Sequence, residues 1–284
     1  MEASLDIRPS PIAGRWYPGD AARLAESVDQ YINSAAVPPI EGQIIGIIAP
    51  HAGHLYSGPV AGFAFAALRG MNPTLVVIVS PMHHPYYQPL LTSSHAAYET
   101  PLGPVLLDQQ ALLELDENLK DVLGFGLSAV RKDPEHSVEI ELPFLQRALA
   151  NEFHLLPVMV RDQSARTTEV LGHAIAKTVK DKNVILVAST DLSHFYPQSV
   201  ANGLDGVLLH EVEAFNPKGV LLADEEGRGF ACGKGALAAI LWAARDLGAN
   251  HVQMLHYATS GEVTGDFEQV VGYGSAVVTR QTPV

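Results

Sequence analysis

Histidine side chains follow three apolar runs of this sequence, each at the point where the run ends. The runs and the polar residues after them are 44–49 with His51, 74–80 with His83 and His84, and 184–188 with Asp191 and His194. Imidazole is a ligand for iron, zinc and copper. If the three run ends lie together, they offer the donors of a metal site. Taken singly, each histidine can also be explained as a loop residue that satisfies backbone groups or faces solvent, and for His83 and His84 alone an exposed loop is the favoured interpretation.

The single cysteine, Cys232, is another candidate ligand, and its being alone excludes an intramolecular disulfide. It precedes a predicted helix at 236–247, where the helix dipole favours a thiolate. Thiolate is a soft metal ligand, so two histidines and Cys232 can hold a divalent ion with positions left open. A small buried apolar group and an intermolecular link are the alternatives for this thiol.

Residues close to these run ends are candidates for the wall of a cleft. Glu135 and His136 begin a predicted helix at 135–145. They can surround a ligand, although acids in a first helical turn are also common for structural reasons. Tyr56 follows the first histidine on the same loop. We expect His136, Tyr56 and His84 to bind substrate.

Buried strands must position these side chains. The three apolar runs lack polar alternation, which is expected of strands covered on both faces in a parallel sheet. Because parallel strands end at the same edge of a sheet, the three run ends should lie together. Ligands of open α/β sheets bind beyond this carboxyl edge. The sequence predicts one α/β domain over 1–284, a three-layer sandwich whose central sheet is mostly parallel or mixed and has helices on both faces.

Periodicity and turn residues predict the remaining elements. Helices are expected at 21–32, 59–68, 109–119, 135–145, 164–180, 203–215 and 236–247, and further strands at 88–92, 104–107, 153–160, 251–257 and 270–278. The Pro- and Gly-rich segment 8–18 carries Trp16 and Tyr17. Since burying a large aromatic ring contributes on the order of 2 kcal/mol, we expect this segment to form a clasp packed on the cleft side of the sheet.

Composition restricts the class of protein. The chain has 284 residues, of which 47% are hydrophobic, enough for a sizeable core. A formal net charge of -13 and the lack of a basic cluster disfavour nucleic acid as a partner. Neither a signal peptide nor a run of about 18 apolar residues is evident, so no membrane association is predicted and a cytoplasmic location is expected.

An ordered set of motifs resembles the Memo family, whose prokaryotic members are called AmmeMemoRadiSam system protein B. The motifs are Gly14-Arg15-Trp16-Tyr17, Pro50-His51-Ala52-Gly53, Tyr56-Ser57-Gly58, Ser80-Pro81-Met82-His83-His84, Glu135-His136-Ser137-Val138-Glu139, Ser189-Thr190-Asp191-Leu192-Ser193-His194 and Cys232-Gly233. The resemblance runs nearly end to end. It implies the fold of the class III extradiol dioxygenases, which contain non-haem iron, and a functional link to a radical SAM protein.

Carried over by position, the resemblance implies that His51, His83 and Cys232 are metal ligands, with Asp191 and His194 beside them. The metal implied is Fe(II), with copper or zinc as alternatives. Those dioxygenases hold iron with two histidines and a carboxylate, so a thiolate in the third place argues against simple ring cleavage. The sequence also leaves open whether the second ligand is His83 or its neighbour in the chain.

Two functions of different class follow from these expectations. The first is an iron-dependent oxidoreductase in which His194 transfers protons and Asp191 orients it and raises its pKa. The second is a non-catalytic adaptor that uses the same cleft to hold a metal or a peptide. A zinc hydrolase is less favoured, because no glutamate stands in a zinc-protease motif. In each case the cleft takes a small-molecule or peptide ligand.

Overall fold

The computed structural model describes residues 5–282, and its centre is a nine-stranded mixed sheet. Four parallel strands form the middle of this sheet in the order β2, β9, β3, β8. They are β2 (Gln43–Ala49), β9 (Val184–Ser189), β3 (Leu75–Pro81) and β8 (His154–Val160). The three predicted apolar runs are therefore adjacent, parallel strands, and their carboxyl ends share one edge.

Antiparallel strands extend the sheet on both sides. On one side β12 pairs antiparallel with β2, β11 and β10, while on the other side β4 pairs antiparallel with β8 and parallel with β7. Their bounds are β12 (Val270–Arg280), β11 (His251–Thr259), β10 (His194–Tyr196), β4 (Leu90–Ser93) and β7 (Ser128–Val130). A separate small sheet contains β1 (Ile7–Arg8), β5 (Ala97–Tyr98) and β6 (Val105–Leu106).

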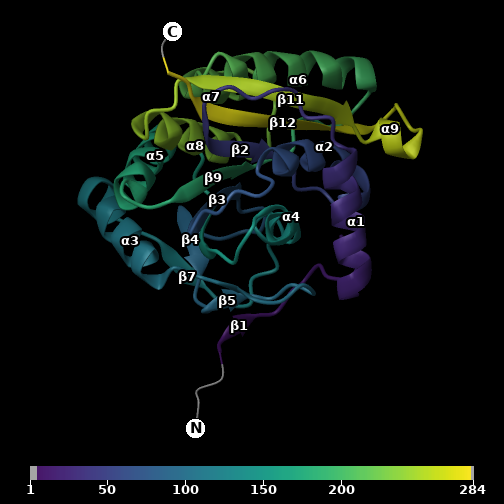
Figure 1. Ribbon diagram of the computed structural model, residues 1–284. Coiled ribbons are helices and arrows are strands. Elements are labelled where there is room, and N and C mark those ends of the chain that lie inside the picture. The colour runs from purple at the N-terminus through teal and green to yellow at the C-terminus, as the bar shows by residue number, and fades with distance from the viewer. Residues whose placement is uncertain (1–4, 283–284) are drawn as a thin grey trace.

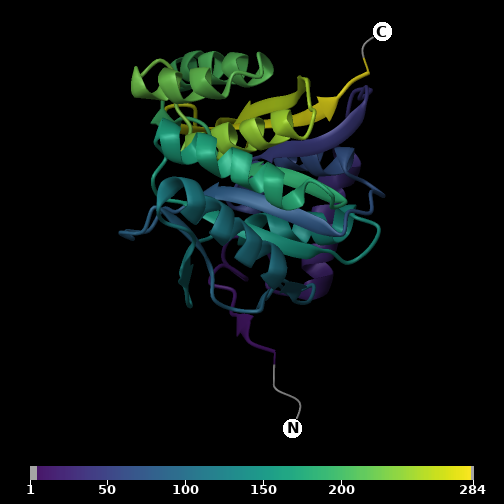
Figure 2. The same ribbon diagram turned by 90° about the vertical axis from the view of Figure 1, so that its left-hand side faces the viewer.

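Helices cover both faces of the sheet, which confirms the predicted three-layer α/β architecture (Figure 1). One group contains α1 (Ala21–Ser34), α2 (His54–Ala67) and α4 (Leu142–Ala148). The other contains α3 (Gln109–Leu123), α5 (Ala165–Val179), α6 (Gln198–Glu213), α7 (Pro217–Glu225) and α8 (Lys234–Asp246). Figure 2 shows this second group in front of the strands. Two single turns, η1 (Glu139–Glu141) and α9 (Gly261–Thr264), complete the fold.

The middle strands are apolar because both of their faces are covered. Every residue of β3 is buried, and so are all but the first residues of β8 and β9. Helix α1 shows the complementary pattern: Asp20 caps its first turn by accepting a hydrogen bond from the N–H of Arg23 (3.0 Å), and Leu24, Val28 and Ile32 form its buried stripe. Local sequence and burial thus agree in these elements.

The helix predicted at 135–145 is wrong in its first half. Residues 133–138 form a turn, and helical structure begins only with η1 and continues into α4. The Glu135 carboxylate accepts hydrogen bonds from the N–H groups of His136 (2.9 Å) and Ser137 (3.0 Å), an arrangement that replaces helical bonding. Pro143 stands in the first turn of α4, where proline is tolerated.

Two other helices begin earlier than the sequence predicts. Helix α2 starts at His54 and contains Pro59, which was expected to open it, and α6 starts at Gln198. The prediction also missed α7 and the short strands β7 and β10. No helix of residues 5–282 has the length and apolarity needed to cross a membrane.

The contact between α1 and α2 leads to a stability prediction. A Cβ atom at Gly62 of α2 would lie 2.5 Å from the backbone oxygen of Tyr31 in α1, whereas a Cβ at Gly203 of α6 would meet nothing within 4 Å. We expect Gly62→Ala to lower the free energy of unfolding by about 1–3 kcal/mol, because the helices must separate. Gly203→Ala should be neutral or add up to about 1 kcal/mol. Chemical denaturation measures both, and equal effects would contradict the packing argument.

Candidate metal centre

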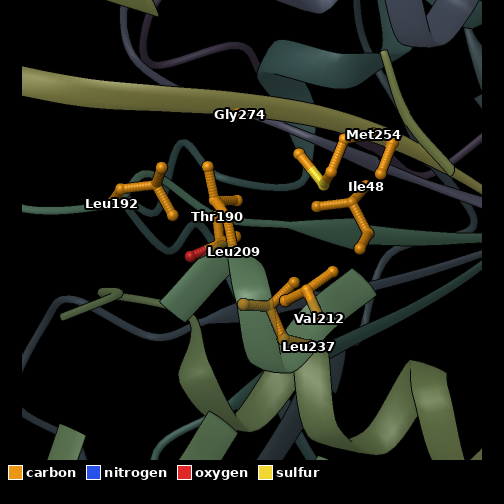
Figure 3. A pocket seen from close by; sticks show the side chains of 9 residues that line it. Ile48, Thr190, Leu192, Leu209, Val212, Leu237, Met254 and Gly274 are labelled. Carbon is orange, nitrogen blue, oxygen red and sulfur yellow. The ribbon is translucent and has the colours of Figure 1, made fainter. Parts of the chain in front are cut away.

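A cleft of about 490 Å³ opens at the shared carboxyl edge of β2, β9 and β3. It is lined by Arg15, Trp16, His51, Ala52, Gly53, Leu55, Tyr56, His83, His136, Asp191, His194, Val271 and Tyr273. A second cavity, of only about 10 Å³, lies between α6, α8 and the strands β11 and β12. Figure 3 shows that mostly aliphatic side chains surround it. A cavity this small and apolar is not a binding site for a metal or a substrate. The cleft is therefore the candidate site.

Three histidines converge on this cleft from separate parts of the chain. His51 follows β2, His83 follows β3, and His136 belongs to the turn before η1. One possible ligand atom from each lies within 4.8 Å of the others. The ring centroid of His51 is 5.2 Å from that of His83 and 5.4 Å from that of His136. This group can hold a metal ion, and it adds His136, which the sequence assigned to substrate binding, to the two expected histidines.

Glu135 fixes the orientation of His83. Its carboxylate lies 2.9 Å from His83 Nδ1 and accepts a hydrogen bond from the His83 backbone N–H at 2.6 Å. Burial by itself would raise the pKa of Glu135, but the hydrogen bonds from His83 and the nearby ring of His136 hold it below its usual range. An ionised carboxylate at Nδ1 leaves Nε2 of His83 free to bind a metal.

His51 is buried and remains neutral. Burial, with the neighbouring His83, lowers the pKa of His51 to about 3. Burial and the proximity of His51 likewise lower the pKa of His136 to about 3. Nδ1 of His51 lies 3.0 Å from Oγ of Ser189, so Nε2 is the nitrogen that remains for a ligand. Neutral imidazoles keep a lone pair available for a metal even in mildly acidic solution.

Cys232 lies beside His51 but outside the group of three. Its Sγ atom is 3.2 Å from Nε2 of His51 and accepts a hydrogen bond from the N–H of Asp191 at 3.3 Å. The segment is pressed against the end of β9, because a Cβ atom at Gly233 would lie 2.7 Å from the carbonyl oxygen of Ser189. Burial and the charge of Asp191 raise the pKa of the thiol and outweigh the backbone N–H groups, including that of Gly233 before α8, which favour a thiolate.

Asp191 contacts the loop of His51 and not the ring of His194. Its Oδ1 atom accepts hydrogen bonds from the N–H groups of His51 (2.8 Å) and Ala52 (3.2 Å). Burial raises the pKa of Asp191 to about 6, even though these bonds oppose the shift.

His194 lines the cleft, and its Nδ1 atom is buried with no hydrogen-bond partner among residues 5–282. Burial lowers the pKa of His194, and the opposing attraction of Asp191 is smaller. The sequence prediction of a raised pKa is therefore wrong in direction, since desolvation outweighs the carboxylate.

The N-terminal clasp packs on the cleft side, as predicted. The ring centroid of Trp16 lies 4.1 Å from that of His136, and its carbonyl oxygen accepts a hydrogen bond from the N–H of His54 at 2.8 Å. Tyr17 is buried and donates a hydrogen bond to Glu139 at 2.7 Å. The clasp thus joins the first turn of α2 to the segment that carries His136.

Of the other residues predicted to bind substrate, one lines the cleft and one does not. Tyr56 lines the cleft, whereas His84 is not among the lining residues. His83 is therefore the histidine of that pair which the fold presents to the site. Arg15 and Tyr273 also line the cleft, and neither was predicted from the sequence to do so. The Gly-Arg-Trp-Tyr motif was the available signal for Arg15, while Tyr273 lies in a strand that carried no polar cluster.

Comparison with known proteins identifies the family of this chain. A family profile described as "Memo-like protein" matches residues 8–277. The chain belongs to the Memo family. Among its curated relatives, a "MEMO1 family protein" of Nitrosopumilus maritimus is 36% identical over 273 residues, covering 95% of this chain and 98% of the relative. Relatives named in the same way from Methanococcoides burtonii and Thermotoga neapolitana are each 34% identical, covering 96% of this chain and 100% and 99% of theirs.

The lowered pKa values of His51 and His136 predict how the stability of the metal-free protein depends on pH. Each ring binds a proton below pH of about 6.5 in the unfolded chain, but only near pH 3 in the folded one. These two rings should therefore contribute a decrease in the free energy of unfolding as the pH falls from 6.5 toward 3. In His136→Ala we expect this fall to be shallower by up to about 1.4 kcal/mol per pH unit. Urea denaturation at several pH values measures the slope, and identical slopes would contradict the assignment.

Proposed function

We propose that this Memo-family protein is a metal-dependent oxidoreductase whose metal, Fe(II) in preference to copper or zinc, binds in the cleft at the carboxyl edge of β2, β9 and β3. The observation that carries the proposal is the convergence of three imidazoles within 4.8 Å of one another. Imidazole suits Fe(II), Cu(II) and Zn(II), whereas hard ions prefer oxygen ligands. A bound metal of this kind would supply redox and Lewis-acid chemistry to a ligand in the cleft.

The donor set fits a metal with open positions. His51 and His83 are both fixed through Nδ1, which leaves Nε2 as the coordinating atom. His136 is the third member of the group, whereas Cys232 lies beside His51 alone and is the second candidate for the third ligand. Bond lengths of about 2.0 Å to nitrogen and 2.3 Å to sulfur place tetrahedral ligands about 3.5 Å apart, close to the 3.2 Å between His51 Nε2 and Cys232 Sγ. The thiolate predicted from the sequence therefore stays a proposal beside His136.

His194 is proposed to transfer protons. Its ring lines the cleft and its lowered pKa keeps it neutral, so it can accept a proton from a ligand bound there. Asp191 is proposed to act through the backbone of His51 and Ala52, since its Oδ1 atom holds that loop in place. In this assignment Asp191 is a positioning residue.

The cleft walls favour a small molecule with both apolar and anionic parts. Trp16, Tyr56 and Val271 supply apolar surface. Arg15 is the only cationic residue of the lining, and it forms no salt bridge within residues 5–282. In a chain of net charge -13, an arginine without a carboxylate partner is well suited to attract an anionic ligand. A peptide ligand and a link to a radical SAM protein stay predictions.

Metal affinity tests the ligand set. We expect His51→Ala and His83→Ala each to weaken Fe(II) binding at least about 100-fold, because each removes a ligand from the shared group. His136→Ala and Cys232→Ser are measured beside them, and the larger loss identifies the third ligand. A matched control is His173→Ala, since His173 lies on α5 and pairs with Asp246. Anaerobic competition with a chelator gives the affinities, and losses no greater than in the control would refute the site.

Oxygen consumption tests the catalytic part. The Fe(II)-loaded protein should consume oxygen with a reducing organic anion faster than the same concentration of free iron. His194→Ala should lower this rate about 10²–10⁴-fold while Fe(II) affinity stays within threefold, because it removes a proton acceptor and no ligand. Parallel loss of metal would make His194 a ligand. A rate equal to that of free iron for the wild type would favour the non-catalytic alternative.

A further inference from the structure

Glu141 is a buried carboxyl group that the proposed function does not use. It lies at the end of η1, has no exposed surface, and takes part in no salt bridge within residues 5–282. Its Oε1 atom lies 2.6 Å from Oγ of Ser189, while its Oε2 atom is buried and has no hydrogen-bond partner. An ionised carboxylate in such surroundings is very costly, so this group requires an explanation.

The hydrogen bonds of Ser189 determine where the protons lie. Its Oγ atom has three neighbours: the carbonyl oxygen of Ser137 at 2.8 Å, Oε1 of Glu141 at 2.6 Å and Nδ1 of His51 at 3.0 Å. A hydroxyl group has one proton to donate and two lone pairs that accept. The carbonyl oxygen of Ser137 can only accept. If all three contacts are hydrogen bonds, the proton of Ser189 therefore points to Ser137, and the other two neighbours both donate.

We propose that Glu141 is held as a neutral carboxylic acid that donates its proton to Ser189, and that these two residues fix His51 as the Nδ1–H tautomer with Nε2 facing the cleft. In this arrangement each of the three short contacts of Ser189 is a hydrogen bond. The atom without a partner, Oε2, is then the carbonyl oxygen of a neutral acid. Burying a neutral carbonyl oxygen costs far less free energy than burying a charged carboxylate oxygen.

The surroundings of Glu141 agree with a neutral acid. Burial and the charge of Asp191 both raise its pKa, and only the contact with Ser189 opposes them. The titratable groups that face it are Asp191 and, through Ser189, His51, and neither is a permanent cation. If Glu141 were ionised instead, it would take the proton of Ser189 and leave the Ser137 carbonyl oxygen without a donor.

The two expected histidines are therefore positioned in different ways. Ionised Glu135 contacts Nδ1 of His83 directly, while neutral Glu141 acts on His51 through a hydroxyl group. Both arrangements direct Nε2 toward the ligand. The neutral relay does so without adding a second negative charge, and Glu141 and Ser189 are positioning residues for His51. The role in metal binding depends on the proposed function, whereas the tautomer does not.

Two spectroscopic measurements on the metal-free protein test the proposal directly. Infrared difference spectra of the wild type and Glu141→Gln at pH 7.5 should contain the C=O band of a protonated carboxylic acid, lost in the variant. Nitrogen-15 NMR of the imidazoles, with His51 assigned from His51→Ala, should find the proton on Nδ1. Absence of the band, or a proton on Nε2 in the wild type, overturns the proposal whether or not the protein binds Fe(II).

Variants test the positioning role. Ser189→Ala removes the acceptor for Nδ1–H, so we expect the His51 proton to move to Nε2 and Fe(II) affinity to fall about 10–100-fold. In Glu141→Gln the amide N–H can donate to Ser189, so the tautomer and the affinity, within threefold, should be retained. Ser57→Ala is the matched control, since Ser57 is a buried serine that donates to the carbonyl oxygen of Ala52.

An unchanged tautomer in folded Ser189→Ala overturns the relay. If Ser189→Ala does not fold, the wild-type tautomer and the Glu141 band still decide the question. A changed tautomer with unchanged Fe(II) affinity would retain the relay and reject the metal site at His51, so the failures of the two proposals are distinguishable.

Discussion

The parallel pairing of β2, β9 and β3 is the constraint on which the site depends. Ala49 of β2 is paired with Ser189 of β9, and the next N–H, of Thr190, donates to the carbonyl oxygen of Ala49 at 2.9 Å. The chain must therefore leave β2 and β9 at the same level. This register places Ser189 beside His51 and brings Asp191 under the backbone of the same loop. A shift of one residue would turn these side chains to the opposite face of the sheet.

Desolvation decides the charge of almost every group at this edge. Burial keeps His51 and His136 neutral by lowering their pKa values and raises the pKa values of Asp191 and Cys232. Glu135 is the exception, because three backbone N–H groups and the ring of His83 stabilise its negative charge. This edge of the sheet therefore combines the negative charge of Glu135 with neutral imidazoles. Such a site favours a cation over protons, since a divalent ion interacts with all the donors at once.

The strands and their ends could be predicted from sequence, because an apolar run that stops at a polar cluster is a local pattern. The turn at 133–138 could not. Its conformation depends on Glu135 bonding to His83, which is 52 residues away in the chain, and on its capture of neighbouring N–H groups that a helix would use. For the same reason His136 was expected in the wall of the cleft and not among the possible ligands. The pKa of His194 could not be predicted either, since the sequence names its acidic neighbour but not the burial that outweighs it.

The position of His136 depends finally on Arg8, which lies in the N-terminal strand β1. Arg8 is buried, forms salt bridges with Asp133 at 2.9 Å and Glu139 at 2.6 Å, and donates to the carbonyl oxygen of Glu135 at 2.6 Å. Buried charges of this kind are tolerated only when they are paired. Burial of Arg8 therefore requires that both acids are in place. Because they stand on either side of Glu135 and His136, the ion pairs hold both ends of the turn that carries these residues. The N-terminal strand and the clasp thus act on the site from outside the cleft, and the central sheet alone would not complete it.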